Sequence, residues 1–124
     1  MSARALLTAS GVSGALAVAL GAFGAHGLAD AVAPERLETW RTGAAYHLAH
    51  AVAIAVAAVG VRLGWRSGAS GALFLAGTVL FSGSLYALVL LDLAWLGAVA
   101  PVGGACFIAG WLALAWAGWR EAGA

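Results

Sequence analysis

The chain has 124 residues, of which 64% are hydrophobic and only 9% are charged, and its mean hydropathy is +0.98. Soluble domains are about half apolar and a quarter charged. A soluble protein this small cannot bury so large an apolar fraction, so the composition excludes a water-soluble domain and predicts a chain surrounded by a lipid bilayer. A formal net charge of +1 without a basic run argues against nucleic acid as a partner.

Charged residues divide the chain into four apolar stretches, each long enough to cross a membrane. A helix needs about 20 apolar residues to span the hydrocarbon core. Because these glycine-dense stretches lack the alternation of strands, helices are expected rather than a barrel. The sequence therefore predicts an all-α integral membrane four-helix bundle, a single domain of residues 1–124. The expected spans are about 5–26, 43–61, 69–91 and 95–118, with an outer loop at 27–42.

The first span ends in LGAFGAHGL, which runs from Leu20 to Leu28. In lipid, small residues let helices approach closely, and van der Waals contact then holds the helices together. We therefore expect Gly21 and Gly24 to pack against a neighbouring helix. His26 ends the span at the outer side, where it either caps the helix end or belongs to a polar site.

The outer loop, 27–42, contains the sequence APERLETWRTG. Pro34 suits the first position of a helix, and Glu35 favours its positive end. Trp40 is expected among the lipid headgroups, as aromatic residues at membrane interfaces often are. The loop therefore predicts a short interfacial helix that lies over the outer mouth of the bundle.

Polar side chains from the second and third spans are expected near the same membrane face. Tyr46, His47 and His50 lie in the first turns of the second span, and Tyr86 lies about two turns before Asp92, where the third span ends. Ionisable groups inside a membrane usually face the bundle interior or a cavity. The candidate polar or ligand site consists of His26, Tyr46, His50, Tyr86 and Asp92.

Within this site, His26 and His50 are expected to face each other from adjacent helices, whereas His47 is close enough to the headgroups to be solvated. A histidine, tyrosine and carboxylate set suits a quinone head group or a proton pathway, because histidine titrates near neutrality. Haem ligation by two histidines ranks below this reading, and a metal site ranks lowest. No cofactor and no metal are predicted, with quinone or haem left as the alternatives.

The remaining candidate packing residues lie in the third and fourth spans. Gly83 follows Ser82 in LFSGSLY, where serine is expected to bond a helix carbonyl or a neighbouring helix. Pro101 either kinks the fourth span or marks its true start. Gly103 and Gly104 follow this proline and are expected at a helix contact.

Arginine placement predicts orientation, because cytoplasmic loops carry an excess of basic residues. The four arginines on one side are Arg4, Arg62, Arg66 and Arg120, and the two on the other side are Arg36 and Arg41. We therefore expect both termini to face the cytoplasm.

Four motifs in this order resemble the YgdD-like family of small, uncharacterised four-helix membrane proteins, which has a eukaryotic transmembrane branch. They are LGAFGAHGL, TGAAYHLAHAVA, GTVLFSGSLYAL and APVGGACFIAGW. The resemblance covers nearly the whole chain and implies the fold and a location in a bacterial inner membrane, without an activity. His26, Tyr46, His50, Ser82, Ser84, Tyr86 and Pro101 fall on the family pattern. His47 and Asp92 depart from that pattern.

The leading hypothesis is a non-enzymatic structural or accessory subunit that packs with other membrane subunits or with copies of itself. Its basis is the abundance of glycine, 18 residues, and the small extramembrane mass. The alternative is a small-molecule, quinone or proton-pathway site at the outer-face histidines.

Overall fold

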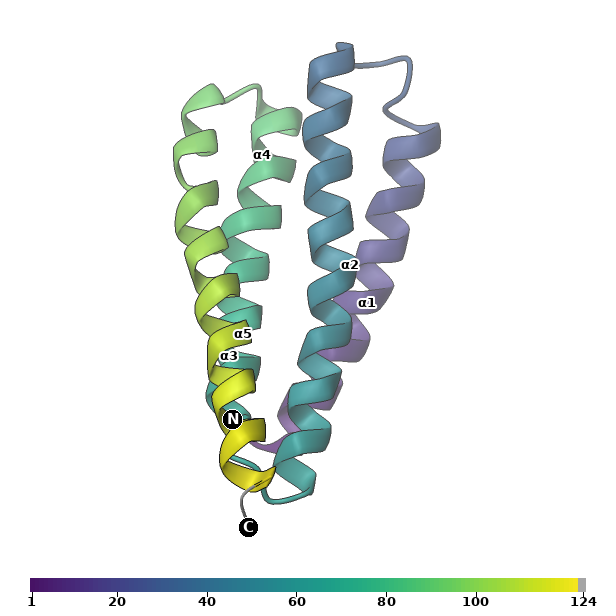
Figure 1. The fold of residues 1–124 in the computed structure, drawn as a ribbon. Coiled ribbons are helices and arrows are strands. Elements are labelled where there is room, and N and C mark those ends of the chain that lie inside the picture. The colour runs from purple at the N-terminus through teal and green to yellow at the C-terminus, as the bar shows by residue number, and fades with distance from the viewer. Residues whose placement is uncertain (123–124) are drawn as a thin grey trace.

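Four helices long and apolar enough to cross a membrane run up and down in turn through the computed structural model, which describes residues 1–122 (Figure 1). The elements are α1 (Ala3–His26), α2 (Pro34–Arg62), α3 (Gly68–Gly77), the π-helix η1 (Thr78–Gly83), α4 (Ser84–Leu91), the 3₁₀-helix η2 (Ala94–Ala98) and α5 (Ala100–Ala122). Because α3, η1 and α4 follow one another without a break, they form one membrane span. The prediction of an all-α four-helix membrane bundle is confirmed.

The helix ends follow from local chemistry. The Ser2 hydroxyl accepts a hydrogen bond from the amide of Ala5, 3.2 Å away, and so caps the start of α1. Pro34 opens α2, and Pro101 lies in the first turn of α5, where its missing N–H leaves no hydrogen bond unmade. Pro101 therefore marks the start of the fourth helix rather than a kink within it. At the end of α4, Asp92 takes a left-handed conformation with φ of 53°.

The first outer loop differs from the expected interfacial helix. The helix that begins at Pro34 continues without interruption to Arg62, so α2 contains the segment that was expected to lie flat over the bundle. Its 29 residues reach about 43 Å at 1.5 Å per residue, which exceeds the hydrocarbon core of about 30 Å. The first turns of α2 therefore stand upright at headgroup depth, and only residues 27–33 connect α1 to α2.

Trp40 was expected among the lipid headgroups, but it is buried, with 1% of its surface exposed. Its indole N–H donates to the carbonyl of Leu20 on α1 over 2.8 Å, and its ring packs beside Phe23 and Tyr86. A partner for the N–H inside the protein makes burial of the ring favourable. Trp40 therefore joins α1, α2 and α4 at the outer end.

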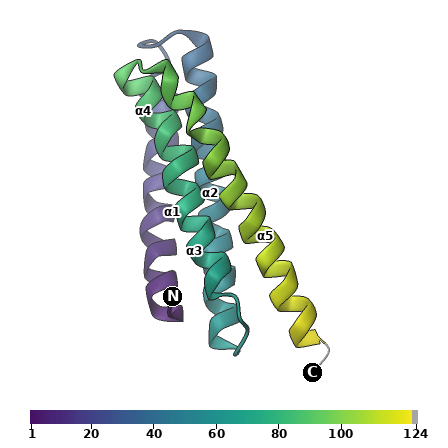
Figure 2. The same ribbon diagram turned by 90° about the vertical axis from the view of Figure 1, so that its left-hand side faces the viewer.

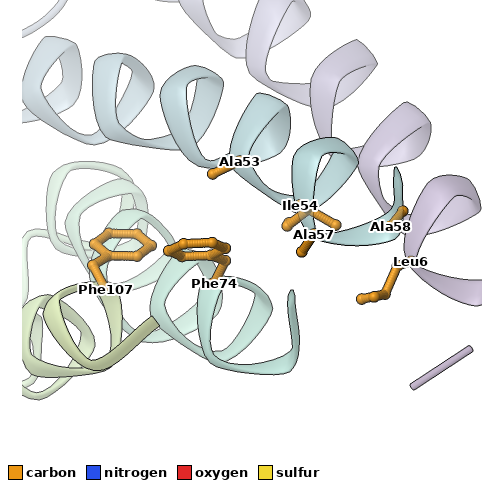
Figure 3. Close-up of a cluster of buried hydrophobic side chains, with 7 residues drawn as sticks. All are labelled: Leu6, Ala53, Ile54, Ala57, Ala58, Phe74 and Phe107. Carbon is orange, nitrogen blue, oxygen red and sulfur yellow. The ribbon is translucent and has the colours of Figure 1, made fainter. Parts of the chain in front are cut away.

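The bundle is built around α2, which contacts α1 on one side and the α3–η1–α4 span on the other. α5 packs on α3 and η1, and its C-terminal half leans away from the bundle (Figure 2). The larger apolar core joins all four spans through Leu6, Ala53, Ile54, Ala57, Ala58, Phe74 and Phe107 (Figure 3). A second core at the outer end contains Leu28, Trp40, Tyr86, Leu88 and Val89.

Two of the five glycines expected at helix contacts lie in tight ones. A Cβ atom on Gly24 would come within 2.6 Å of the indole nitrogen of Trp40. A Cβ atom on Gly103 would come within 2.8 Å of the backbone of Leu80 and Phe81 in η1. At both places the absence of a side chain sets how closely the helices approach.

The other three glycines lie in looser surroundings. Gly21 has open space where a Cβ would project, so the expectation that it contacts a neighbouring helix is wrong. Gly83 and Gly104 have only ordinary van der Waals neighbours, 3.9 Å and 4.0 Å from an added Cβ. Gly21 and Gly24 are separated by a net rotation of about 60° around α1, and only Gly24 meets a neighbouring side chain, that of Trp40.

Candidate functional site

The five residues expected to form one outer-face site do not come together as a group, and only Tyr46 and His50 among them lie side by side. His26 is exposed at the end of α1. Asp92 is also exposed, and its Oδ1 atom accepts a hydrogen bond of 2.8 Å from Nη2 of Arg36. Asp92 thus forms an ion pair at the surface and does not fold inward toward the histidines.

His50 is held by α2 and α5. Its Nδ1–H donates to the carbonyl of Tyr46 over 2.7 Å, and its Nε2 accepts the indole N–H of Trp111 over 3.1 Å. Its ring stacks on Phe107 with centroids 3.5 Å apart. Because an indole N–H can only donate, these bonds assign the proton to Nδ1 and leave neither ring nitrogen free.

The expectation that His50 faces His26 is therefore wrong. The ring of His50 packs against α3 and α5 through Phe74, Phe107 and Trp111, and none of its recorded partners belongs to α1. Through its bond with Trp111, the side chain of His50 links α2 to α5. Tyr46 lies beside it with 46% of its surface exposed and packs against Phe81 and Phe107.

His47, expected near the headgroups, is instead 5% exposed and lies about 20 Å along α2 from Pro34. Its Nδ1 is 3.0 Å from the hydroxyl of Tyr86 on α4, and its Nε2 is 3.1 Å from the hydroxyl of Ser13 on α1. We call these three residues the His47 network. The network connects three helices, which is why a solvated position is not available to His47.

The two histidines of α2 differ in what their partners can do. Both partners of His47 are hydroxyls, and a hydroxyl can donate or accept. The ring can therefore carry its proton on either nitrogen. In one tautomer the O–H of Tyr86 is left to donate elsewhere, and in the other tautomer the O–H of Ser13 is left. The His47 network thus always keeps one hydroxyl donor for a further acceptor.

A groove of about 410 Å³ runs beside the His47 network, between α1 and the α3–η1–α4 span. We call it the lateral groove. Its lining residues are Ala9, Val12, Ser13, Leu16, Leu20, His47, Leu75, Thr78, Val79, Gly83 and Tyr86. From Ala9 to Leu20 it follows α1 for about 17 Å. Since Val12, Leu16 and Val79 are exposed on its walls, the groove opens on the surface that faces lipid.

The π-helix η1 forms one wall of the lateral groove through Thr78, Val79 and Gly83. The π-helix is linked to α2 by a hydrogen bond of 2.7 Å, which the Ser82 hydroxyl donates to the carbonyl of Gly43. The Thr78 hydroxyl donates to the carbonyl of Phe74, in the preceding α3, over 2.9 Å. Single turns of π-helix inside α-helices are frequent at functional sites.

Sequence reasoning missed Ser13, which completes the His47 network. The available signal was weak, because Ser13 is one of three hydroxyl residues in the first half of the span, together with Thr8 and Ser10. It also missed Trp111, whose N–H fixes His50. Among residues 1–122, no cluster of three histidine, cysteine or acidic side chains lies close enough to hold a metal ion.

Comparisons with known proteins place this chain in a family. Residues 20–104 match the family described as "Protein of unknown function (DUF423)". The UPF0382 inner membrane protein YgdD of Escherichia coli K12 is 44% identical over 118 residues, which cover 90% of this chain and 86% of YgdD. The UPF0382 membrane protein YwdK of Bacillus subtilis is 43% identical over 104 residues, or 82% of this chain and 85% of YwdK. No solved structure matches the chain.

A UPF0382 membrane protein of Staphylococcus aureus is 38% identical over 113 residues, which cover 87% of this chain and 89% of that protein. These relatives are named as membrane or inner membrane proteins, which agrees with the four apolar spans. The resemblance to the YgdD-like family is confirmed. This chain belongs to the UPF0382 (DUF423) family of membrane proteins.

Proposed function

We propose that the protein binds a small lipid-soluble molecule in the lateral groove, with the His47 network as the hydrogen-bonding end of the site. The observation that supports this most is the position of a buried, adaptable hydroxyl donor on an apolar groove that opens toward lipid. Ligand sites are commonly apolar pockets of about 300–1,000 Å³ with a few placed polar groups. The ligand class is a quinone-like molecule, with a carbonyl head and an apolar tail.

The spare O–H donor of the His47 network determines the chemistry of the head group, which must carry a hydrogen-bond acceptor. A carbonyl oxygen accepts a hydrogen bond from the free O–H of Tyr86 or Ser13, whichever tautomer His47 adopts. The tail lies along Leu16 and Val12, where the walls offer only apolar contact. A quinone is preferred to a haem because both ring nitrogens of His47 and of His50 already have protein partners.

Replacing Tyr86 with phenylalanine is expected to weaken quinone binding about 2- to 10-fold. The variant keeps the ring and removes one hydroxyl, and a neutral hydrogen bond contributes about 0.5–1.5 kcal/mol. The protein in lipid nanodiscs is titrated with a quinone that carries a decyl tail, and quenching of tryptophan fluorescence reports the dissociation constant.

The matched control is Tyr46→Phe, since Tyr46 is the other tyrosine of the chain and does not line the lateral groove. It should bind the quinone like the parent protein. A second titration uses decylbenzene, which has the tail without the carbonyls and should bind more weakly. Because Ser13 can still donate when Tyr86 is replaced, the double variant Ser13→Ala with Tyr86→Phe decides the matter. If it bound the quinone as tightly as the parent protein, the proposed site would be wrong, and equal binding of the hydrocarbon would also contradict it.

A role as a structural or accessory subunit is the second candidate. It is supported by Gly11 and Gly21 of α1, which have open space around them and are not used inside the bundle. Small residues on a lipid-facing helix let another helix approach. Native mass spectrometry of the protein extracted in gentle detergent distinguishes the candidates, because a second copy or another chain and a small lipid-soluble molecule add different masses to 12.3 kDa.

We further propose that both termini face the cytoplasm, as the excess of arginine at that end of the bundle favours. A reporter fused after Ala124 is expected to be active only in the cytoplasm. A reporter inserted between Asp30 and Ala31, in the loop before α2, is expected to be active only outside. Activity of the two fusions in the reverse compartments would overturn this orientation.

A further inference from the structure

A second cavity of about 390 Å³ lies at the opposite end of the bundle from the connection between α1 and α2. It is formed where α1 begins and α2 ends, and its lining residues are Ala3, Arg4, Leu7, Ala58, Val59 and Arg62. Two arginines thus border one cavity from two helices. The remaining lining is apolar.

These two arginines differ from the others in what surrounds them. Arg36 and Arg41 each form an ion pair, with Asp92 and Glu38. Arg4 and Arg62 take part in neither of the two ion pairs that residues 1–122 form. Two guanidinium groups beside one cavity repel each other, so an anion bound between them would be stabilised by both.

We propose that this cavity binds the phosphate head group of an anionic phospholipid. Arg4 and Arg62 bind the phosphate oxygens, for which the planar guanidinium fork is well suited. The acyl chain lies against Leu7 and Val59, which are both exposed on the lipid-facing side of the helices. Basic pockets between membrane helices bind lipid head groups in this way.

The apolar wall decides between a lipid and a soluble phosphate. A free phosphate ion would be held by the arginines alone and would leave Leu7, Ala58 and Val59 without a role. A phospholipid carries a charged head next to an apolar chain, and the cavity likewise has charged residues next to apolar ones. The site shares no residue with the lateral groove, so phospholipid binding is tested independently of quinone binding.

The test compares two double variants that remove the same charge. One is Arg4→Gln with Arg62→Gln, in the cavity. The other is Arg66→Gln with Arg120→Gln, at the same end of the bundle but outside the cavity. Each protein is purified in detergent and titrated with phosphatidylglycerol or phosphatidylcholine, and native mass spectrometry measures the bound fraction. Tryptophan fluorescence tests whether each variant is folded. If a double variant does not fold, the corresponding single variants are measured instead.

We expect the parent protein to retain phosphatidylglycerol at least 10-fold better than phosphatidylcholine. The cavity variant should lose this preference, and the Arg66 and Arg120 variant should keep it. Equal losses in both double variants would overturn the site, because they would show attraction to net charge alone. If inorganic phosphate displaced the lipid at equal concentration, the assignment to a phospholipid would be overturned, whereas retention of the lipid under an excess of phosphate supports it.

Discussion

Replacement of Trp40 with alanine is expected to lower the free energy of unfolding by about 3 kcal/mol. Loss of a buried tryptophan costs about 3–5 kcal/mol in soluble cores. The lower end is expected here because lipid is itself apolar, so packing and the bond to Leu20 supply most of the loss. Titration with a denaturing detergent, followed by circular dichroism, measures the change.

The control is Trp95→Ala, because 65% of the surface of Trp95 is exposed. It should change the unfolding free energy by less than about 0.5 kcal/mol. Trp40→Phe separates packing from hydrogen bonding, since it retains a ring but cannot donate to Leu20. If Trp40→Ala proved no more harmful than Trp95→Ala, the outer end of the bundle would not depend on this contact.

The number and order of the helices could be predicted from the sequence because a charged side chain is costly inside lipid. Arg4, Arg62 and Asp92 therefore limit where spans can lie. Pro34 was expected at a helix start because proline is favoured in a first turn, whereas for Pro101 the sequence left a kink and a start open. These signals depend on local chemistry and on the bilayer, and neither requires knowledge of the neighbouring helices.

The rotation of each helix about its axis could not be predicted. In a soluble protein a polar face reveals which side points outward. Here alanine, glycine and valine occur on every face of each helix. The sequence therefore does not distinguish Gly21 from Gly24, although only Gly24 packs against a neighbouring helix. The same ambiguity hid the fact that His47 turns toward α1 and α4 while His50 turns toward α3 and α5.

Of the three residues in the His47 network, the sequence placed only Tyr86 in the candidate site. His47 was expected to be solvated, and Ser13 was not singled out, since serine is common in such helices. The lateral groove depends on the separation of α1 from α3 and η1, which is a property of the packed bundle. The turn of π-helix had no sequence signal, and its stability derives from contacts such as that of Ser82 with Gly43.

Gly103 is where the closest approach of α5 to η1 occurs, and its replacement by alanine is expected to destabilise the bundle by about 3 kcal/mol. Overpacking of a tight core usually costs about 1–3 kcal/mol. The upper end is expected because the added Cβ would meet backbone atoms of Leu80 and Phe81 at 2.8 Å, and backbone cannot rotate away as a side chain can. Detergent-induced unfolding provides the measurement.

Gly104→Ala is the matched control, because it adds the same methyl group one residue later. There the Cβ would lie 4.0 Å from the ring of Phe81, which is an ordinary contact. Alanine is also the better helix former by up to about 1 kcal/mol, so Gly104→Ala should be neutral or slightly stabilising. A shift of η1 caused by Gly103→Ala would also move the wall that carries Thr78 and Val79, so this variant should bind quinone more weakly while Gly104→Ala binds it normally. If the two alanine variants were equally stable, the close approach of α5 to η1 would not be a determinant of the fold.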